Sequence, residues 1–327
     1  MSRTPLALLL SALTLATAGA LPAHAAQPAL AASATTEQAT QAGYYRFNVG
    51  ELQVTALSDG SVPVDSHALL KGLSTEQIDK LLARGFQTNP VETSINAFLI
   101  DTGKRLVLVD TGAGTLFGAH TGGRLLGSLS RIGVKPEQID DILITHLHSD
   151  HSGGLVQGGQ IVFPNAVVHV AKSDIDYFLA ADRQNGVPGY DKSYFKIASD
   201  SISPYLASGQ VKTFEGSSEV LPGITTIPAP GHTPGHSNFR LKNGEDSITF
   251  IGDLVHVYAV QMPNPKVTID FDLDQPSASA QRKNRFDAFV AQRERIAAAH
   301  LPYPGIGHLR QDGQGYAFVP VDYRFRP

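Results

Sequence analysis

Four residues able to bind a metal ion lie within six positions at the end of an apolar run. The segment ILITHLHSDHSGGL, residues 142–155, contains them as His146, His148, Asp150 and His151. In an extended chain, residues two apart point to the same side, so the first two histidines can reach one ion. The aspartate and the third histidine follow where two glycines let the chain turn, and they can face a second ion. This spacing favours a metal centre over a surface histidine cluster.

Four side chains cannot complete two metal sites, so further ligands are expected downstream. His232 lies in the proline- and glycine-rich turn PAPGHTPGHS, Asp253 ends the apolar strand of ITFIGDLVH, and His300 in IAAAHLPYPGIGH follows a predicted helix. Each lies at the end of a regular element, where sites on rigid scaffolds are built. Asp253 is a carboxylate that could bridge two ions. The predicted ligand set is therefore five histidines and two aspartates.

Composition narrows the class of protein and of ligand. With 327 residues, of which 42% are hydrophobic, the chain can bury a sizeable core. Its formal net charge of -4 offers no basic field for nucleic acid. The absence of cysteine excludes disulfides and thiolate ligands. Histidine and carboxylate ligands suit zinc or a neighbouring divalent metal.

The elements that must position these ligands alternate between short strands and helices. A capping box at Ser74 predicts the start of a helix, and Lys104, after a Thr-Gly pair, marks a hairpin turn. Two strand-rich halves with covering helices fit an α+β fold, a four-layer αβ/βα sandwich. Strands are expected within residues 44–60, 96–103, 105–114, 141–146, 211–216, 224–232, 237–244 and 247–255, a strand followed by a helix within 166–181, and helices at 75–86, 124–133, 194–208 and 279–300.

The first 25 residues have the pattern of a secretory signal peptide. Arg3 precedes an apolar stretch at residues 5–18, which is too short to span a membrane, and Ala23-His24-Ala25 gives a small-x-small cleavage site. Residues 26–43 are expected to form a disordered tether, and residues 44–327 a single metallo-hydrolase domain. The protein is thus predicted to be periplasmic or secreted. An uncleaved lipid-associated anchor is the alternative.

The order of the ligands resembles that of the metallo-β-lactamase superfamily, whose H-x-H-x-D-H motif matches residues 146–151. The resemblance covers essentially the whole chain from residue 44 and implies a two-metal site along one edge of the sheets. It implies that one ion is held by His146, His148 and His232, the other by Asp150, His151 and His300, with Asp253 as the bridge. Asp110 in LVLVDTGAG matches a position that orients ligands through hydrogen bonds, although a turn-forming aspartate would look the same.

Several further blocks of sequence favour one branch of the superfamily. GYYRFNVGELQVTALSDG, GHTPGHS, AHLPYPGIGH and GYAFVPVDY resemble exported methyl parathion hydrolase-like enzymes and related lactonases. The lack of cysteine and the presence of Asp253 argue against a true β-lactamase, and the missing basic surface argues against a ribonuclease. Glyoxalase-type thioesterases share the ligand set but act on intracellular substrates. The resemblance also implies a homodimer, and it indicates the subfamily more strongly than the substrate.

The predicted reaction is hydrolysis of a neutral ester or lactone, such as an aryl lactone or an acyl-homoserine lactone. Two divalent ions, with Zn²⁺ the default, lower the pKa of a bridging water so that hydroxide attacks the carbonyl carbon. Asp253 and Asp150 are the predicted catalytic carboxylates. The same site could attack phosphorus in an organophosphate triester. A non-catalytic periplasmic metal-binding protein is the alternative from another class.

Substrate choice is expected to depend on mostly aromatic residues that follow the ligand segments. An aromatic pocket favours flat or acyl-bearing neutral substrates. His256 and Phe271 are expected to make it polar and narrow beside the metals, which favours a lactone over an organophosphate. His256 is predicted to line the pocket or support a ligand, and ordinary core packing is the alternative for each aromatic. The predicted pocket residues are Phe117, Phe178, Tyr194, Phe195, His256, Tyr258, Ile269 and Phe271.

Overall fold

The structure, a computed structural model, describes residues 41–118 and 120–323. The predicted signal peptide and most of the predicted tether therefore lie outside the described residues. Within the described ranges, the helices are too short or too polar to cross a lipid bilayer. The strands and helices that position the metal ligands all lie in these ranges.

The first sheet has seven strands and carries the first half of the predicted ligands. Its first four strands pair antiparallel and the remaining neighbours pair parallel. The hairpin predicted at Lys104 joins β4 to β5. In spatial order the strands are β1 (Tyr44–Val49), β2 (Leu52–Val64), β4 (Val91–Asp101), β5 (Leu106–Val109), β6 (Asp141–Leu143), β9 (Val167–Ala171) and β10 (Val211–Phe214).

The second sheet also has seven strands and carries the remaining ligands. Its neighbours pair antiparallel except for β14 and β16, which pair parallel. Two small sheets join β3 (Leu70–Lys71) to β15 (Thr268–Ile269), and β7 (Val156–Gln157) to β8 (Gln160–Ile161). The large sheet runs β11 (Glu219–Leu221), β12 (Ile224–Pro228), β13 (Ser237–Asn243), β14 (Asp246–Phe250), β16 (Arg295–Ala297), β17 (Ile306–Asp312) and β18 (Gly315–Pro320).

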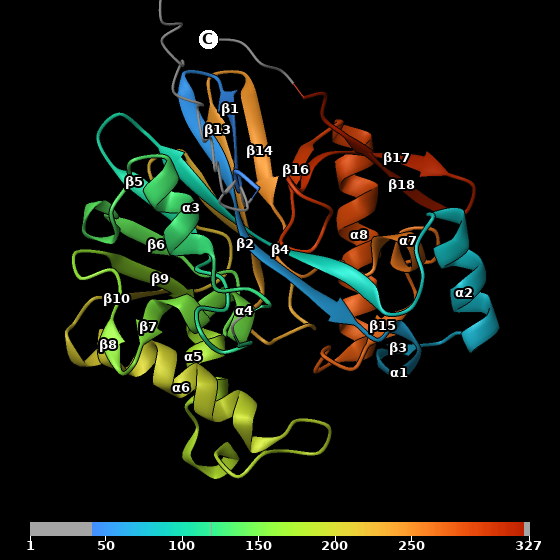
Figure 1. Cartoon of the computed structure of the whole chain (residues 1–327), viewed down its shortest axis with the longest axis horizontal. Helices are drawn as coiled ribbons and strands as arrows, with labels where there is room; N and C mark the ends of the chain where they lie inside the picture. Colours follow the sequence, from blue (N-terminus) through green and yellow to red (C-terminus); the bar gives the residue numbers. More distant parts are fainter. Residues whose placement is uncertain (1–40, 119, 324–327) are drawn as a thin grey trace, which may run out of the picture. The chain divides into compact units, whose positions relative to one another are not determined.

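The two large sheets face each other across an apolar core, and helices cover their outer faces (Figure 1). Between the sheets, the rings of Phe98 and Phe250 lie 5.2 Å apart. The first sheet is covered by α3 (Leu125–Arg131), α5 (Lys172–Phe178) and α6 (Lys192–Ala207), and the second by α8 (Gln275–Gln292). The predicted four-layer sandwich is confirmed.

Helix α2 (Thr75–Arg84) and several shorter helices and 3₁₀ turns complete the described fold. A further apolar cluster joins α2 to α7 (Tyr258–Gln261) and β15. Helix α2 begins with the predicted capping box at Ser74. The other helices are α1 (Ser66–Leu69), α4 (Ser149–Ser152) and the 3₁₀ turns Pro136–Gln138, Gly153–Leu155 and Ala181–Arg183.

The predicted helix at residues 279–300 is wrong at its C-terminal end. Helix α8 ends at Gln292, and Arg293 has a left-handed backbone with φ 52°. The chain then forms β16, which pairs parallel with β14 and buries Ile296 and Ala297 completely. A continued helix would leave the edge of β14 unpaired, so tertiary pairing overrides helical periodicity here. His300 consequently follows a strand and not a helix.

A fully buried carboxylate holds the loop that follows β5. The Asp59 side chain, in β2, accepts hydrogen bonds from the backbone amides of Ala113 (2.8 Å), Gly123 (2.9 Å) and Leu125 (2.9 Å). We expect Asp59→Ala to lower the free energy of unfolding by about 3 kcal/mol, because three backbone amides lose their buried acceptor. Urea unfolding measures this loss. The exposed Asp79→Ala control should change it by less than about 0.5 kcal/mol, and equal effects would contradict the role of Asp59.

Candidate metal centre

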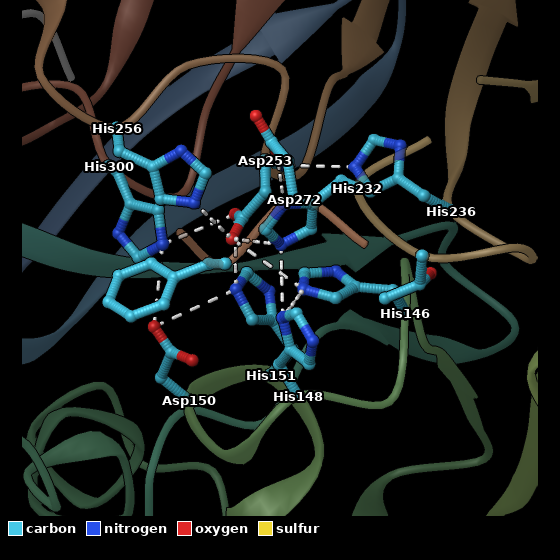
Figure 2. A network of polar contacts seen from close by, with 12 residues as sticks. His146, His148, Asp150, His151, His232, His236, Asp253, His256, Asp272 and His300 are labelled. Carbon is cyan, nitrogen blue, oxygen red and sulfur yellow. Dashed lines mark hydrogen bonds and ion pairs between the residues drawn. The ribbon is translucent and has the colours of Figure 1, made fainter. Parts of the chain in front are cut away.

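The seven predicted ligands meet where several strands end (Figure 2). His146 lies just beyond β6, and His148 directly precedes α4, which carries Asp150 and His151. His232 follows β12, while Asp253 and His300 follow β14 and β16. Both sheets therefore deliver predicted ligands to one place. The hydrogen-bonded strands of each sheet hold the backbone that carries these side chains.

One group of ligand atoms, the first trio, belongs to His146, His148 and His232. The Nδ1 atom of His148 lies 3.0 Å from Nε2 of His146 and 3.0 Å from Nε2 of His232. Oδ2 of Asp253 lies 3.5 Å from Nε2 of His146 and 3.2 Å from Nε2 of His232. These four donor atoms lie within 4.8 Å of one another, close enough to surround one ion.

The second trio is Asp150, His151 and His300, and it faces the other oxygen of Asp253. Oδ1 of Asp253 lies 3.1 Å from Nε2 of His151 and 3.2 Å from Nε2 of His300. Oδ2 of Asp150 lies 3.4 Å from the same nitrogen of His300. Each oxygen of Asp253 is therefore directed at a different trio, as a bridging carboxylate requires.

The polar atoms at the centre are buried and face one another without hydrogen bonds. Nε2 of His151 and Oδ1 of Asp253 lie 3.1 Å apart, but neither forms a hydrogen bond among the described residues. Such atoms are costly to bury unless something binds them. Burial also lowers the pKa of His146 and His148 well below the usual value, which leaves their rings neutral with lone pairs available. This set of nitrogen and carboxylate donors fits divalent metal ions.

Asp110, the predicted supporting residue, lies directly behind a ligand. Its Oδ2 accepts a hydrogen bond of 2.8 Å from Nδ1 of His151, which leaves Nε2 of that ring free to face the centre. The backbone amide and the hydroxyl of Thr145 both donate to Asp110, each at 2.8 Å. Its backbone is left-handed, with φ 57°, in the turn that follows β5. Burial opposes a charge on His151, but Asp253, Asp150 and Asp110 outweigh it and raise the pKa well above normal.

Comparison with known proteins agrees with the geometry of the site. Residues 90–300 match the family model of the metallo-beta-lactamase superfamily. The chain belongs to this superfamily. It is 28% identical over 181 residues to an N-acyl homoserine lactonase of Bacillus cereus, a match that covers 50% of this chain and 64% of that one. A lactonase from a Bacillus species is 29% identical, over 44% of this chain and 57% of the relative. The chain thus spans less than two thirds of these relatives.

Two solved structures resemble the chain over nearly its whole described length. The hydrolase AbOPH of the beta lactamase superfamily has a TM-score of 0.83 and 37% identity, covering 88% of this chain and 100% of that one. AidC, a dizinc quorum-quenching lactonase, has a TM-score of 0.77 and 26% identity, covering 86% and 99%. The predicted superfamily and the class of metal-dependent hydrolases are confirmed by these similarities.

Three residues that support this metallo-β-lactamase centre were missed by sequence reasoning: Asp174, Tyr190 and Asp272. Asp174 is fully buried in α5 and accepts from the amides of Leu147 (3.0 Å) and Gly235 (2.6 Å), which joins the segments carrying the first trio. Burial raises its pKa to about 6. In the sequence it is an ordinary acidic residue in the first turn of a helix, so no local signal distinguishes it. For Tyr190 the sequence does contain a local signal, because the proline-glycine pair directly before it marks a turn.

Asp272 supports the first trio in the way that Asp110 supports the second. Its Oδ1 accepts a hydrogen bond of 2.8 Å from Nδ1 of His232, and its Oδ2 lies 3.5 Å from the buried Arg282 guanidinium. Burial opposes a charge on His232, but Asp253 and Asp272 raise its pKa to about 9. His300 is held differently, because its Nδ1 donates to the backbone oxygen of Ser94 at 2.8 Å.

We expect Asp272→Asn to weaken zinc binding by about 10–100-fold, because the neutral amide no longer fixes the His232 ring or raises its basicity. Competition with a chromophoric chelator measures the affinity. Asp274→Asn, two residues away at the exposed N-terminus of α8, is the matched control and should leave zinc affinity unchanged. Equal affinities of the two variants would show that Asp272 does not orient the ligand.

Two further histidines lie beside the bridging carboxylate. His236 accepts a hydrogen bond from the backbone amide of Asp253 at 2.9 Å and donates one to the Ala229 oxygen at 3.1 Å. Burial lowers its pKa to about 3. The Nε2 atom of His256 lies 3.0 Å from Oδ2 of Asp253, and neither ring nitrogen has a hydrogen-bond partner among the described residues. His256 also lines the cavity at the centre.

A cavity of about 330 Å³ opens beside the metal ligands. Of the predicted pocket residues, four line it: Phe117, Tyr194, His256 and Phe271. Much of the aliphatic wall was not predicted from the sequence. It is formed by residues of β2, α1 and α6, namely Val62, Val64, Leu69 and Ile197. The described lining residues include no Lys or Arg.

Four pocket predictions are wrong. Phe178 and Phe195 are fully buried in the core between the first sheet and its helices, and Ile269 is fully buried with α2 and α7. Tyr258 lines a separate hollow beside β18. The reason is geometric, because neighbouring residues of a helix point about 100° apart, so Tyr194 faces the cavity while the next residue faces the sheet.

Proposed function

We propose that the protein is a dinuclear metal-dependent hydrolase of neutral esters and lactones, with Zn²⁺ as the preferred metal. The observation that carries this proposal is the placement of Asp253, whose two oxygens are directed at separate trios beside an apolar cavity. The cavity has no cationic lining residue that would attract an anionic substrate. A neutral acyl lactone suits its aliphatic and aromatic walls.

Two divalent ions bound by the trios would polarise the scissile carbonyl and activate a water molecule for attack. Asp253 and Asp150 both line the cavity, so their carboxylates would be placed to orient this water and to accept its proton. Phe117, Tyr194 and Phe271 would hold the acyl or aryl group against the wall. His256 lines the cavity with its Nε2 3.0 Å from Oδ2 of Asp253, and it would be placed to contact a polar atom of the substrate.

The relatives support the lactone over other neutral esters. The Bacillus cereus relative is an N-acyl homoserine lactonase, and AidC is a quorum-quenching lactonase. The alternative is an organophosphate triester, which is also neutral and whose aryl group would fit the same aromatic rings. The position of His256 and Phe271 beside the centre narrows the cavity there and favours the planar carbonyl.

Steady-state kinetics of the zinc-loaded protein without residues 1–25 tests this proposal. The values of kcat/KM are compared for an aryl lactone, an acyl-homoserine lactone and methyl parathion. A lead of more than about tenfold for a lactone, about 1.4 kcal/mol of transition-state preference, supports the proposal. A lead for methyl parathion would make the protein a phosphotriesterase. Bound zinc without turnover of any substrate would indicate a metal-binding protein.

We also propose that the protein is exported and that it acts as a homodimer. The basis for export is the signal-peptide pattern of residues 1–25, and the basis for the dimer is the resemblance to exported hydrolases. N-terminal sequencing of protein from the extracytoplasmic fraction should begin at Ala26. Light scattering of the same sample measures the assembly. Material that starts at the initiating Met in the cytoplasmic fraction would contradict export.

A further inference from the structure

One buried residue anchors a surface turn directly to a metal ligand. In the fully described segment 185–191, which precedes α6 in Figure 1, Tyr190 is the buried residue while its neighbours are exposed or partly exposed. Its hydroxyl lies 2.8 Å from Nε2 of His148 and also contacts the backbone oxygen of Phe271. The turn therefore reaches the centre through a single hydroxyl group.

The local sequence VPGYD places this tyrosine. Val187 and Tyr190 exchange backbone hydrogen bonds of 2.9 and 2.8 Å across the turn, and Gly189, with φ 84°, takes the left-handed position after a proline. Asp191 then caps α6 by accepting from the Ser193 amide at 2.8 Å. The hydroxyl of Tyr190 is thus held between a fixed turn and the start of a helix.

The direction of the hydrogen bonds follows from the geometry of His148. Its Nδ1 is the atom that meets the other nitrogens of the first trio, so Nδ1 must carry a free lone pair when an ion is bound there. The proton is then on Nε2, which donates to the hydroxyl oxygen of Tyr190. The hydroxyl proton in turn is donated to the Phe271 oxygen.

The same tyrosine also contacts two walls of the substrate cavity. Its ring lies 4.4 Å from the ring of Tyr194, and the residue whose oxygen it binds, Phe271, lines the cavity from the opposite segment. Without an ion, the His148 proton can move to Nδ1, and the chain of donors to Phe271 loses its fixed direction. One side chain therefore contacts both a histidine of the first trio and the backbone of the Phe271 wall.

We propose that Tyr190 is a positioning residue that fixes His148 for the first metal and couples occupancy of that site to the turn 185–191 and the Phe271 wall. The proposal requires that the centre binds metal, but it does not require a lactone substrate. Its tests use zinc binding and hydrogen exchange without substrate. A wrong substrate class would therefore leave it standing, and its failure would leave the hydrolase proposal standing.

The first test compares stepwise zinc affinities of the wild type, Tyr190→Phe and Tyr205→Phe by chelator competition. Tyr205 is the matched control, because it is a buried tyrosine on α6 whose hydroxyl accepts from Phe163 at 3.1 Å and donates to Leu155 at 3.2 Å, among core residues of the outer helical layer. We expect Tyr190→Phe to weaken one zinc step by about 10–100-fold. Tyr205→Phe should change neither step, although it can lower stability. Unchanged zinc affinities of Tyr190→Phe would overturn the proposal.

The second test is hydrogen exchange of three amides. Those of Val187 and Tyr190 donate to each other's carbonyl oxygens within the turn, and that of Gly186 donates to the oxygen of Arg183 just before it. Zinc should slow their exchange in the wild type by about tenfold, since the turn must open for exchange to occur. In Tyr190→Phe this zinc response should be lost, while in Tyr205→Phe it should remain. If Tyr190→Phe fails to fold, the wild type alone decides: equal exchange with and without zinc would overturn the coupling.

Discussion

Asp253→Asn is expected to lower kcat/KM by about 10³-fold while leaving the fold intact. The side chain keeps its size, but one oxygen becomes an amide nitrogen that cannot bind a cation. The distances of 3.2 Å to His232 and 3.1 Å to His151 show that each oxygen serves a different trio, so one trio loses its shared ligand. Loss of one preorganised electrostatic element in an active site costs effects of this size.

Steady-state kinetics and metal analysis of the same samples check this result. We expect metal content to fall together with activity, because the amide leaves one trio incomplete. Asp79→Asn, which removes an exposed carboxylate outside the centre, is the control and should behave as the wild type. A variant at position 253 that kept kcat/KM within about tenfold of wild type and its full metal content would refute the bridging assignment.

Removal of the metal ions by a chelator is expected to abolish hydrolysis and to lower Tm by on the order of 10 °C. Ions that bind only the folded state stabilise it by about 4 kcal/mol at a free concentration near 1,000 times Kd. For a domain of this size each kcal/mol corresponds to a few degrees. Nε2 of His151 and Oδ1 of Asp253, which are buried and form no hydrogen bond among the described residues, would lose their cation.

Calorimetry before and after chelation, followed by addition of Zn²⁺, Co²⁺ or Mn²⁺, measures both effects. Recovery of activity and Tm with one ion identifies the metal that the site prefers. Asp253→Asn should show a smaller drop in Tm on chelation than the wild type, because it binds less metal. Full activity of the chelated protein would exclude the proposed metal-dependent mechanism.

Local sequence was sufficient to predict the seven side chains that meet at the centre and to indicate the architecture. The H-x-H-x-D-H segment is a short continuous stretch, and the other predicted ligands follow apolar strands. The hydrophobic periodicity of the strands and the turn residues after them are therefore enough to predict that these side chains lie at strand ends. The alternation of strands and helices likewise indicated two covered sheets. The same reasoning failed for residues 295–297, since their pattern fits a helix face and pairing with β14 makes them a strand.

Only the tertiary structure decided which residues support the ligands and shape the cavity. Asp272 lies 40 residues from His232, Tyr190 lies 42 from His148, and Asp174 lies 59 from Thr233, whose hydroxyl it binds. None of these pairs has a local spacing, because a buried carboxylate or hydroxyl can satisfy any donor that folding brings near it. The residues that line the cavity are decided in the same way, because only helix side chains that do not pack against the sheet can face the cavity. Hydrophobic periodicity in the sequence therefore predicts which strands and helices carry the predicted ligands. The packing of elements that are distant in the sequence determines which residues support those ligands.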